Sequence, residues 1–168
     1  WESFHAEQNL YRQANTNLLS RSIAQNWKVI SLKVIPIGLK KTVMEYLDSK
    51  GIEYKDFGTY TSDSCDYPVY GKAVAHAVAD GQCDKGIIIC GTGIGISITA
   101  NKVKGIRAAL CHDVFSAKAT REHNDANILA MGARVIGPGL ALEIVKAFLE
   151  TEFSGDERHI RRIAMIEE

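Results

Sequence analysis

Short apolar runs and amphipathic segments alternate along most of this 168-residue chain. Apolar runs that predict buried strands lie at 29–37, 52–57, 86–90, 106–111 and within 128–136. Segments with helical periodicity lie at 39–49, 67–80, 94–103, 114–123, 140–151 and 156–168. Strands that alternate with helices at this spacing predict an α/β fold, in which helices cover both faces of a five-stranded parallel sheet.

Capping residues support several of these helix boundaries. Gly51 follows the first helix, where a glycine in the left-handed conformation often ends a helix. Pro68 fits the first turn of a helix that begins at Tyr67. Asp66 and Asp113 precede helical segments and are expected to act as N-caps.

Residues 1–27 depart from the regular pattern. They are rich in Gln, Asn and Ser, with a loose helical stripe at Phe4, Tyr11 and Leu18. We therefore expect an atypical N-terminal extension over 1–27 and a domain over 28–168. The extension would be a helix that docks elsewhere, a partly disordered segment or an artefact of a gene boundary.

The composition excludes some function classes. Lys and Arg together number 20, as do Asp and Glu, so no global field recruits nucleic acid or a membrane surface. The four cysteines form no C-x-x-C pair, and we expect free thiols in a reducing cytoplasm. We expect no membrane span, because no stretch is long and apolar enough.

The segment 87–97 (IIICGTGIGIS) carries the most informative chemistry. A buried strand ends at Cys90, and Gly91, Gly93 and Gly95 then lead into a helix. Free N–H groups and the positive end of the helix dipole favour an anion at such a turn, and they favour a thiolate at Cys90. The alternatives are a tight strand-to-helix turn without a ligand and a buried core thiol.

The spacing of these glycines argues against a nucleotide site. The motif G-x-G-x-G differs from the dinucleotide fingerprint G-x-G-x-x-G, so the sequence gives little support to the hypothesis of NAD or ATP binding. Thr92, inside the motif, would either cap the helix or donate a hydrogen bond to a developing oxyanion.

Two further polar clusters are candidates for function. In 121–127 (REHNDAN), His123 would shuttle protons and Asn124 would hold a hydroxyl, unless this is simply a solvated loop. Arg158 and Arg162 share one helical face and suit a phosphate dianion, although such pairs are common on surfaces.

Two long blocks, 56–78 (DFGTYTSDSCDYPVYGKAVAHAV) and 89–137 (ICGTGIGISITANKVKGIRAALCHDVFSAKATREHNDANILAMGARVIG), resemble the ribose-5-phosphate isomerase B family. That family also includes galactose-6-phosphate and allose-6-phosphate isomerases, and the resemblance runs from about Lys28 to the C-terminus. It implies a Rossmann-like three-layer α/β/α sandwich without a metal or nucleotide cofactor. It also implies a homodimer or homotetramer with active sites at the subunit interface.

The resemblance implies interconversion of aldose and ketose phosphates through a cis-enediolate, with ribose 5-phosphate and ribulose 5-phosphate of the pentose phosphate pathway as the favoured pair. Cys90 would move the proton between the two carbons, Thr92 would stabilise the enediolate and His123 would assist ring opening. The implied substrate-binding set comprises Tyr67, Gly91, Gly93, Gly95, Asn124, Arg158 and Arg162.

The segment after the first strand departs from the family pattern. Family members carry an Asp and a His there, whereas 30–38 reads ISLKVIPIG. The alternative function is therefore a catalytically impaired sugar-phosphate-binding protein, or a partner subunit of a hetero-oligomeric isomerase. A shifted reading frame or an alternative first exon would explain both this segment and the unusual residues 1–27.

Overall fold

The computed structural model describes residues 29–31, 37–58, 60 and 64–168. Its strands are β1 (Val29–Ser31), β2 (Tyr54–Asp56), β3 (Lys85–Cys90), β4 (Ala108–Leu110) and β5 (Ile128–Gly132). Its helices are α2 (Ile37–Ser49), α3 (Tyr67–Ala79), α4 (Ile94–Ala100), α5 (Val114–Asn124), α6 (Pro138–Glu150) and α7 (Glu157–Glu167). The predicted extension at 1–27 and most of the altered segment, 32–36, lie outside the described residues.

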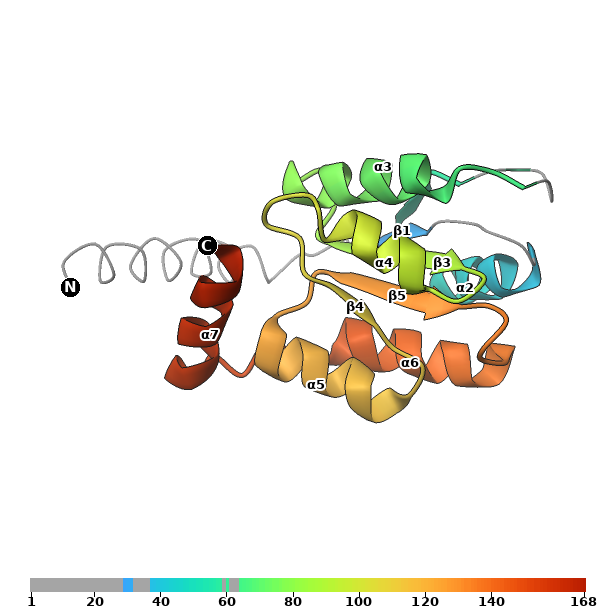
Figure 1. The fold of residues 1–168 in the computed structure, drawn as a ribbon. Coiled ribbons are helices and arrows are strands. Elements are labelled where there is room, and N and C mark those ends of the chain that lie inside the picture. The colour runs from blue at the N-terminus through green and yellow to red at the C-terminus, as the bar shows by residue number, and fades with distance from the viewer. Residues whose placement is uncertain (1–28, 32–36, 59, 61–63) are drawn as a thin grey trace.

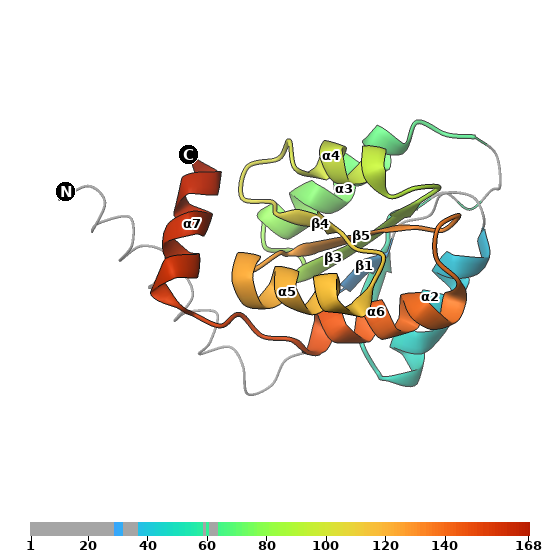
Figure 2. The ribbon, with the colours of Figure 1, turned by 60° about the horizontal axis from the view of Figure 1, so that its bottom comes forward.

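The strands pair in parallel in the order β2-β1-β3-β5-β4. Helices α3 and α4 cover one face of this sheet, and α2, α5 and α6 cover the other (Figures 1 and 2). The predicted α/β fold with a parallel sheet is therefore confirmed.

Alternate residues of β3 belong to different cores. Ile87 and Ile89 pack with α2, α5 and α6, whereas Ile88 and Cys90 pack with α3 and α4. A strand covered on both faces has to be apolar at successive positions. This explains why the run IIIC shows no alternation of polar and apolar residues.

Two predicted caps are confirmed and one is wrong. Gly51 has φ +66 after α2, and the Ile52 N–H donates to the Leu47 carbonyl in a Schellman arrangement. Asp113 accepts a hydrogen bond from the Ser116 N–H.

Asp66 precedes α3 but makes no side-chain capping bond. A capping side chain accepts from the second or third N–H of the helix. Here the second residue is Pro68, which has no N–H, and the Val69 N–H already donates to the Asp66 carbonyl.

Several element boundaries differ from prediction by a few residues. Ile37, expected in the first strand, begins α2, and α4 ends at Ala100 rather than 103. The strand expected within 128–136 covers Ile128–Gly132, and residues 133–136 fold back as a turn in which the N–H groups of Val135 and Ile136 donate to the Gly132 carbonyl.

No helix in the described ranges has the length and apolar character needed to cross a membrane.

Candidate active site

Cys90 is the buried last residue of β3 at the carboxyl end of the sheet, where ligands of open parallel sheets bind. Its Sγ accepts a hydrogen bond from the Gly93 N–H at 2.9 Å. A donor aimed at the sulfur stabilises it when it carries negative charge. The glycine turn therefore aims one of its own backbone amides at the Cys90 sulfur.

Gly93 allows this hydrogen bond because of its conformation and its surroundings. Its φ is +79, in the left-handed region that favours glycine. A Cβ at this position would collide with the Leu110 side chain and would lie 2.9 Å from the Met131 carbonyl carbon. The turn is thus held tightly between β4 and β5.

Tyr67 lies against the first turn of α4. A Cβ on Gly95 would collide with the Tyr67 hydroxyl and would lie 2.7 Å from the ring carbon that bears it. The absence of a side chain at 95 therefore makes room for the ring. The fold brings Tyr67 next to the glycine turn, as expected for a residue that lines the same site.

Thr92 is exposed at the tip of the turn. Its Oγ1 accepts a hydrogen bond from the Ile94 N–H at 3.3 Å, so it contributes to the start of α4. A hydroxyl that accepts one bond keeps its own proton available to donate. Both predicted roles of Thr92, capping and donation to an oxyanion, are compatible with this geometry.

Arg134 is a candidate that the sequence interpretation missed. Its N–H donates to the Gly91 carbonyl at 3.0 Å, and its guanidinium side chain lies 3.6 Å from where a Cβ on Gly91 would stand. The exposed guanidinium adds positive charge beside the turn. The available signal was an arginine inside an apolar run that the periodicity assigned to a strand.

A second group of candidates lies on α5 and α7. His123 and Asn124 are exposed at the C-terminal end of α5. The His123 ring stands 4.5 Å from the ring of buried His159, whose Nδ1 is 3.0 Å from the Ser154 Oγ. On α7, Arg158 and Arg162 are both exposed. This group is assembled by the packing of α7 against α5.

The two groups lie at opposite ends of the sheet. Helix α5 begins after the carboxyl end of β4 and runs back, so His123 lies at the amino ends of the strands while Cys90 lies at the carboxyl ends (Figure 1). The six residues of β3 alone span roughly 20 Å. One copy of the chain therefore does not bring Cys90 and His123 to the same substrate.

Cys111 is a second buried cysteine near the carboxyl end of the sheet, where it follows β4. Burial, with a smaller effect of the Asp113 carboxylate, raises the pKa of the Cys111 thiol to about 11. Cys111 is therefore a neutral thiol near pH 7.

A hollow of about 520 Å³ lies at the amino end of the sheet, beside the second group. Asn124 lines it, together with residues 101–109 and the end of α7, whereas Cys90 does not. Within the described ranges, no three His, Cys, Asp or Glu side chains gather as metal ligands would.

The comparisons with known proteins all indicate the same family. The family model for ribose/galactose isomerases matches residues 34–166. Ribose-5-phosphate isomerase B of Escherichia coli is 49% identical over 128 residues, covering 76% of this chain and 85% of the relative. Galactose-6-phosphate isomerase subunit LacB of Clostridium acetobutylicum is 46% identical over 130 residues, covering 77% and 75%.

Solved structures agree with this result. Ribose-5-phosphate isomerase B of Clostridium thermocellum superposes with a TM-score of 0.80 at 51% identity, covering 83% of this chain and 94% of that one. The enzyme of Mycoplasma genitalium with bound ribulose-5-phosphate gives a TM-score of 0.78 at 37% identity, covering 83% and 93%. Since sequence and structure agree over most of its length, the chain belongs to the ribose/galactose isomerase family and is a sugar-phosphate isomerase of the ribose-5-phosphate isomerase B type.

Proposed function

We propose that this isomerase interconverts ribose 5-phosphate and ribulose 5-phosphate through a cis-enediolate, at a site shared between two copies of the chain. The observation that carries the proposal is the placement of the candidates. Cys90 and the glycine turn lie at one end of the sheet, and the His123 and arginine group lies at the other. In a two-fold dimer each copy would supply one end to each of two equivalent sites.

Cys90 is the base in this proposal. Its thiolate, stabilised by the Gly93 N–H, takes a proton from the carbon next to the substrate carbonyl, and the carbonyl oxygen becomes an oxyanion. The hydroxyl on the carbon that lost the proton then passes its own proton to this oxyanion, and the same thiol protonates the former carbonyl carbon, so that the carbonyl of the ketose forms at the carbon that was deprotonated. Thr92 and the remaining amides at Gly91 and Gly95 would stabilise the oxyanion, at typically 3–4 kcal/mol per well-placed donor.

The second copy supplies the other functions. His123 moves the proton during ring opening, and Asn124 holds a sugar hydroxyl. Arg158 and Arg162 bind the phosphate dianion, because two guanidinium groups on one helical face match its oxygens. Arg134 beside Gly91 adds a cation from the first copy.

One sequence observation favours a second candidate function. The segment 30–38 carries neither the Asp nor the His that the family pattern places there. A chain without these groups would retain phosphosugar binding but lose efficient ring opening. It would then act as a sugar-phosphate-binding protein, or as one subunit of a hetero-oligomeric isomerase.

The test follows sugar phosphates by NMR in deuterated water. Ribose 5-phosphate, galactose 6-phosphate and erythrulose 4-phosphate are each incubated with wild type, Cys90→Ala and the control Cys111→Ala. We expect deuterium to enter at the exchanged carbon with ribose 5-phosphate. Loss of Cys90 should slow this about 10²–10⁴-fold, as loss of a general base does, and loss of the neutral thiol Cys111 should leave the rate within a few-fold.

Three other results would each change a different part of the proposal. Turnover that survives Cys90→Ala removes Cys90 as the base. Faster conversion of another sugar phosphate reassigns the substrate. Binding of ribose 5-phosphate without conversion supports the impaired, binding-only function.

A further inference from the structure

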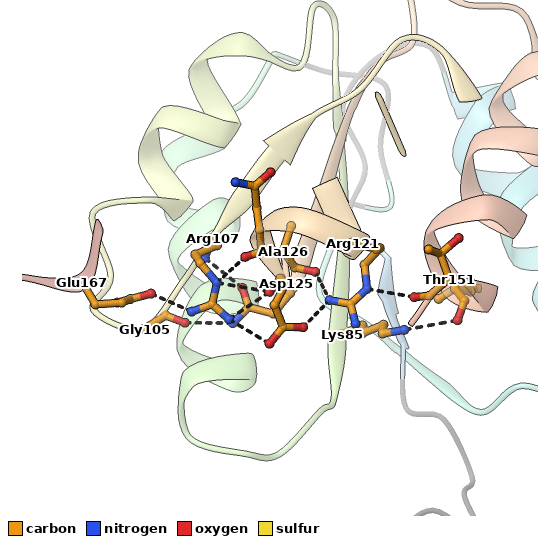
Figure 3. A network of polar contacts seen from close by, with 11 residues as sticks. Lys85, Gly105, Arg107, Arg121, Asp125, Ala126, Thr151 and Glu167 are labelled. Carbon is orange, nitrogen blue, oxygen red and sulfur yellow. Dashed lines mark hydrogen bonds and ion pairs between the residues drawn. The ribbon is translucent and has the colours of Figure 1, made fainter. Parts of the chain in front are cut away.

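Arg107 connects the two helices that carry the second group of candidates. It directly precedes β4 at the amino end of the sheet, and its side chain is 14% exposed. Its Nη1 donates to Glu167 Oε1 on α7 at 2.6 Å. Its Nε and Nη2 donate to backbone carbonyls at the end of α5 (Figure 3). One guanidinium therefore joins α5 to α7.

The contacts with α5 hold the end of the helix that carries His123 and Asn124. Nε lies 2.9 Å from the Asn124 carbonyl oxygen, and Nη2 lies 2.8 Å from that of Asp125. The last carbonyls of a helix have no partner within the helix, so a cation that donates to them stabilises its end. Asp125 has φ +46, an uncommon conformation for a residue with a side chain.

The contact with Glu167 fixes the far end of α7. The other end of this helix is held by buried His159, beside His123, and Ile163 is fully buried between the two. Two anchors about 12 Å apart along a helix set its direction as well as its position. Arg162 lies between the two anchors and Arg158 directly precedes His159, so the placement of both arginines relative to Asn124 depends on the anchors.

Arg121 supports the same junction from the opposite side. Its Nη1 donates to Asp125 Oδ1 at 2.8 Å and to the Ala126 carbonyl, and its Nε donates to the Thr151 carbonyl ahead of α7. Asp125 thus lies between two guanidinium groups (Figure 3). The link from Arg107 to Glu167 can be removed while this buried part of the network stays in place.

We infer that Arg107 is a positioning residue, which sets α7 against the end of α5 through Glu167 and the carbonyls of Asn124 and Asp125. It thereby places the phosphate-binding arginines at the right distance from the groups that hold the sugar. This inference rests on the proposed function for its substrate, a sugar phosphate. Arg107 itself need not touch that substrate.

The test uses Glu167→Gln, which removes the charge on α7 and leaves the bonds from Arg107 to α5 intact. Phosphate held by Arg158 and Arg162 is bound equally in the ground and transition states, so a small displacement of α7 raises KM rather than lowering kcat. We expect KM for ribose 5-phosphate to rise about three- to tenfold with kcat within twofold. The control Glu168→Gln makes the same change at the exposed neighbouring residue and should leave KM unchanged.

Several results would overturn the inference: an unchanged KM in both Glu167→Gln and Glu167→Ala, an equal rise in Glu168→Gln, or a fall in kcat and melting temperature without a change in KM.

If wild type converts no sugar phosphate, the proposed function fails and calorimetry with inorganic phosphate decides the inference separately. Weaker phosphate binding in Glu167→Gln than in Glu168→Gln supports it. Equal binding in both variants, or no binding by wild type, contradicts it.

Discussion

Two glycines of the turn after β3 lack a side chain for different physical reasons. At Gly93 the backbone requires glycine, since φ is +79 and the Met131 backbone leaves no space. At Gly95 the helix would accept any residue, but the ring of Tyr67 occupies the space where a side chain would stand. The first glycine shapes the hydrogen bond to Cys90, and the second admits an aromatic residue to the site.

Gly95→Ala is therefore predicted to be destabilising in spite of the higher helix propensity of alanine. The methyl group would have to displace Tyr67, and overpacking of this kind costs about 1–3 kcal/mol. Gly139, also the second residue of its helix, has open space around its Cβ position. Gly139→Ala should gain up to about 1 kcal/mol. Urea unfolding of both variants measures the contrast, and equal effects would contradict the role given to Tyr67.

At this scale, local patterns in the sequence pointed to several candidate site residues, whose roles stay predictions. Cys90, Thr92 and the glycines were recognisable because strand, turn and helix follow each other within a few residues. Arg134 was missed, since its proximity to Gly91 depends on the pairing of β3 with β5. The Asp66 cap failed because Pro68 removes one of the donors on which a cap depends. A local sequence pattern does not tell which strands pair with each other.

Strand β3 begins with a lysine that is buried at the amino end of the sheet. Lys85 is 4% exposed, and its Nζ donates to the Leu149 carbonyl at 3.2 Å. Burial, and next the nearby positive charge of Arg121, lower the pKa of Lys85 from 10.5 to about 8, although Glu152, Asp125 and Asp84 act in the opposite direction. The strand therefore carries a cation that loses its proton more easily when the chain is folded.

This lysine predicts a defined pH dependence of stability. Between pH 8 and 10.5 the unfolded chain keeps the Lys85 proton and the folded chain releases it, so the free energy of unfolding should rise with pH in this window. The free energy of unfolding of wild type minus that of Lys85→Met should therefore increase by up to about 3 kcal/mol across this pH window.

Urea unfolding at several pH values measures this difference, and subtraction of the variant removes the contribution of the tyrosines. The matched control replaces the exposed Lys118 by Met. Its free energy of unfolding should differ from that of wild type by an amount that does not change with pH. A flat difference for Lys85→Met as well would mean that Lys85 keeps its ordinary pKa in the folded chain.

At the element scale, periodicity predicted the order and type of elements better than their ends. A strand was expected within the run 128–136, which is apolar almost throughout. The second half of this run turns back, and the Ala133 N–H donates to the Cys90 carbonyl. Apolar residues that cover a turn and apolar residues in a strand look alike in sequence, so such boundaries need the tertiary structure.

At the scale of the whole molecule, the two groups of candidate residues lie at opposite ends of the sheet, although they were assigned from the sequence to one site. The direction of α5 in the parallel fold leaves the C-terminal end of α5 and the whole of α7 at the opposite end of the sheet from the carboxyl end of β3 (Figure 2). The interpretation from the sequence alone could name both groups, but their distance apart follows from the topology of the sheet. The proposed site, completed by a second copy of the chain, would bring the two groups to one substrate.

The most direct test of this account is complementation between two inactive variants. Cys90→Ala removes the proposed base, and the double variant Arg158→Ala/Arg162→Ala removes the arginines that we propose bind the phosphate, so each alone should be nearly inactive at low ribose 5-phosphate. Random pairing makes half of the dimers mixed, and each mixed dimer has one intact site of two, so the co-expressed pair should recover about a quarter of wild-type activity. Mixed dimers that form, as native mass spectrometry would show, but recover no activity would contradict the shared site.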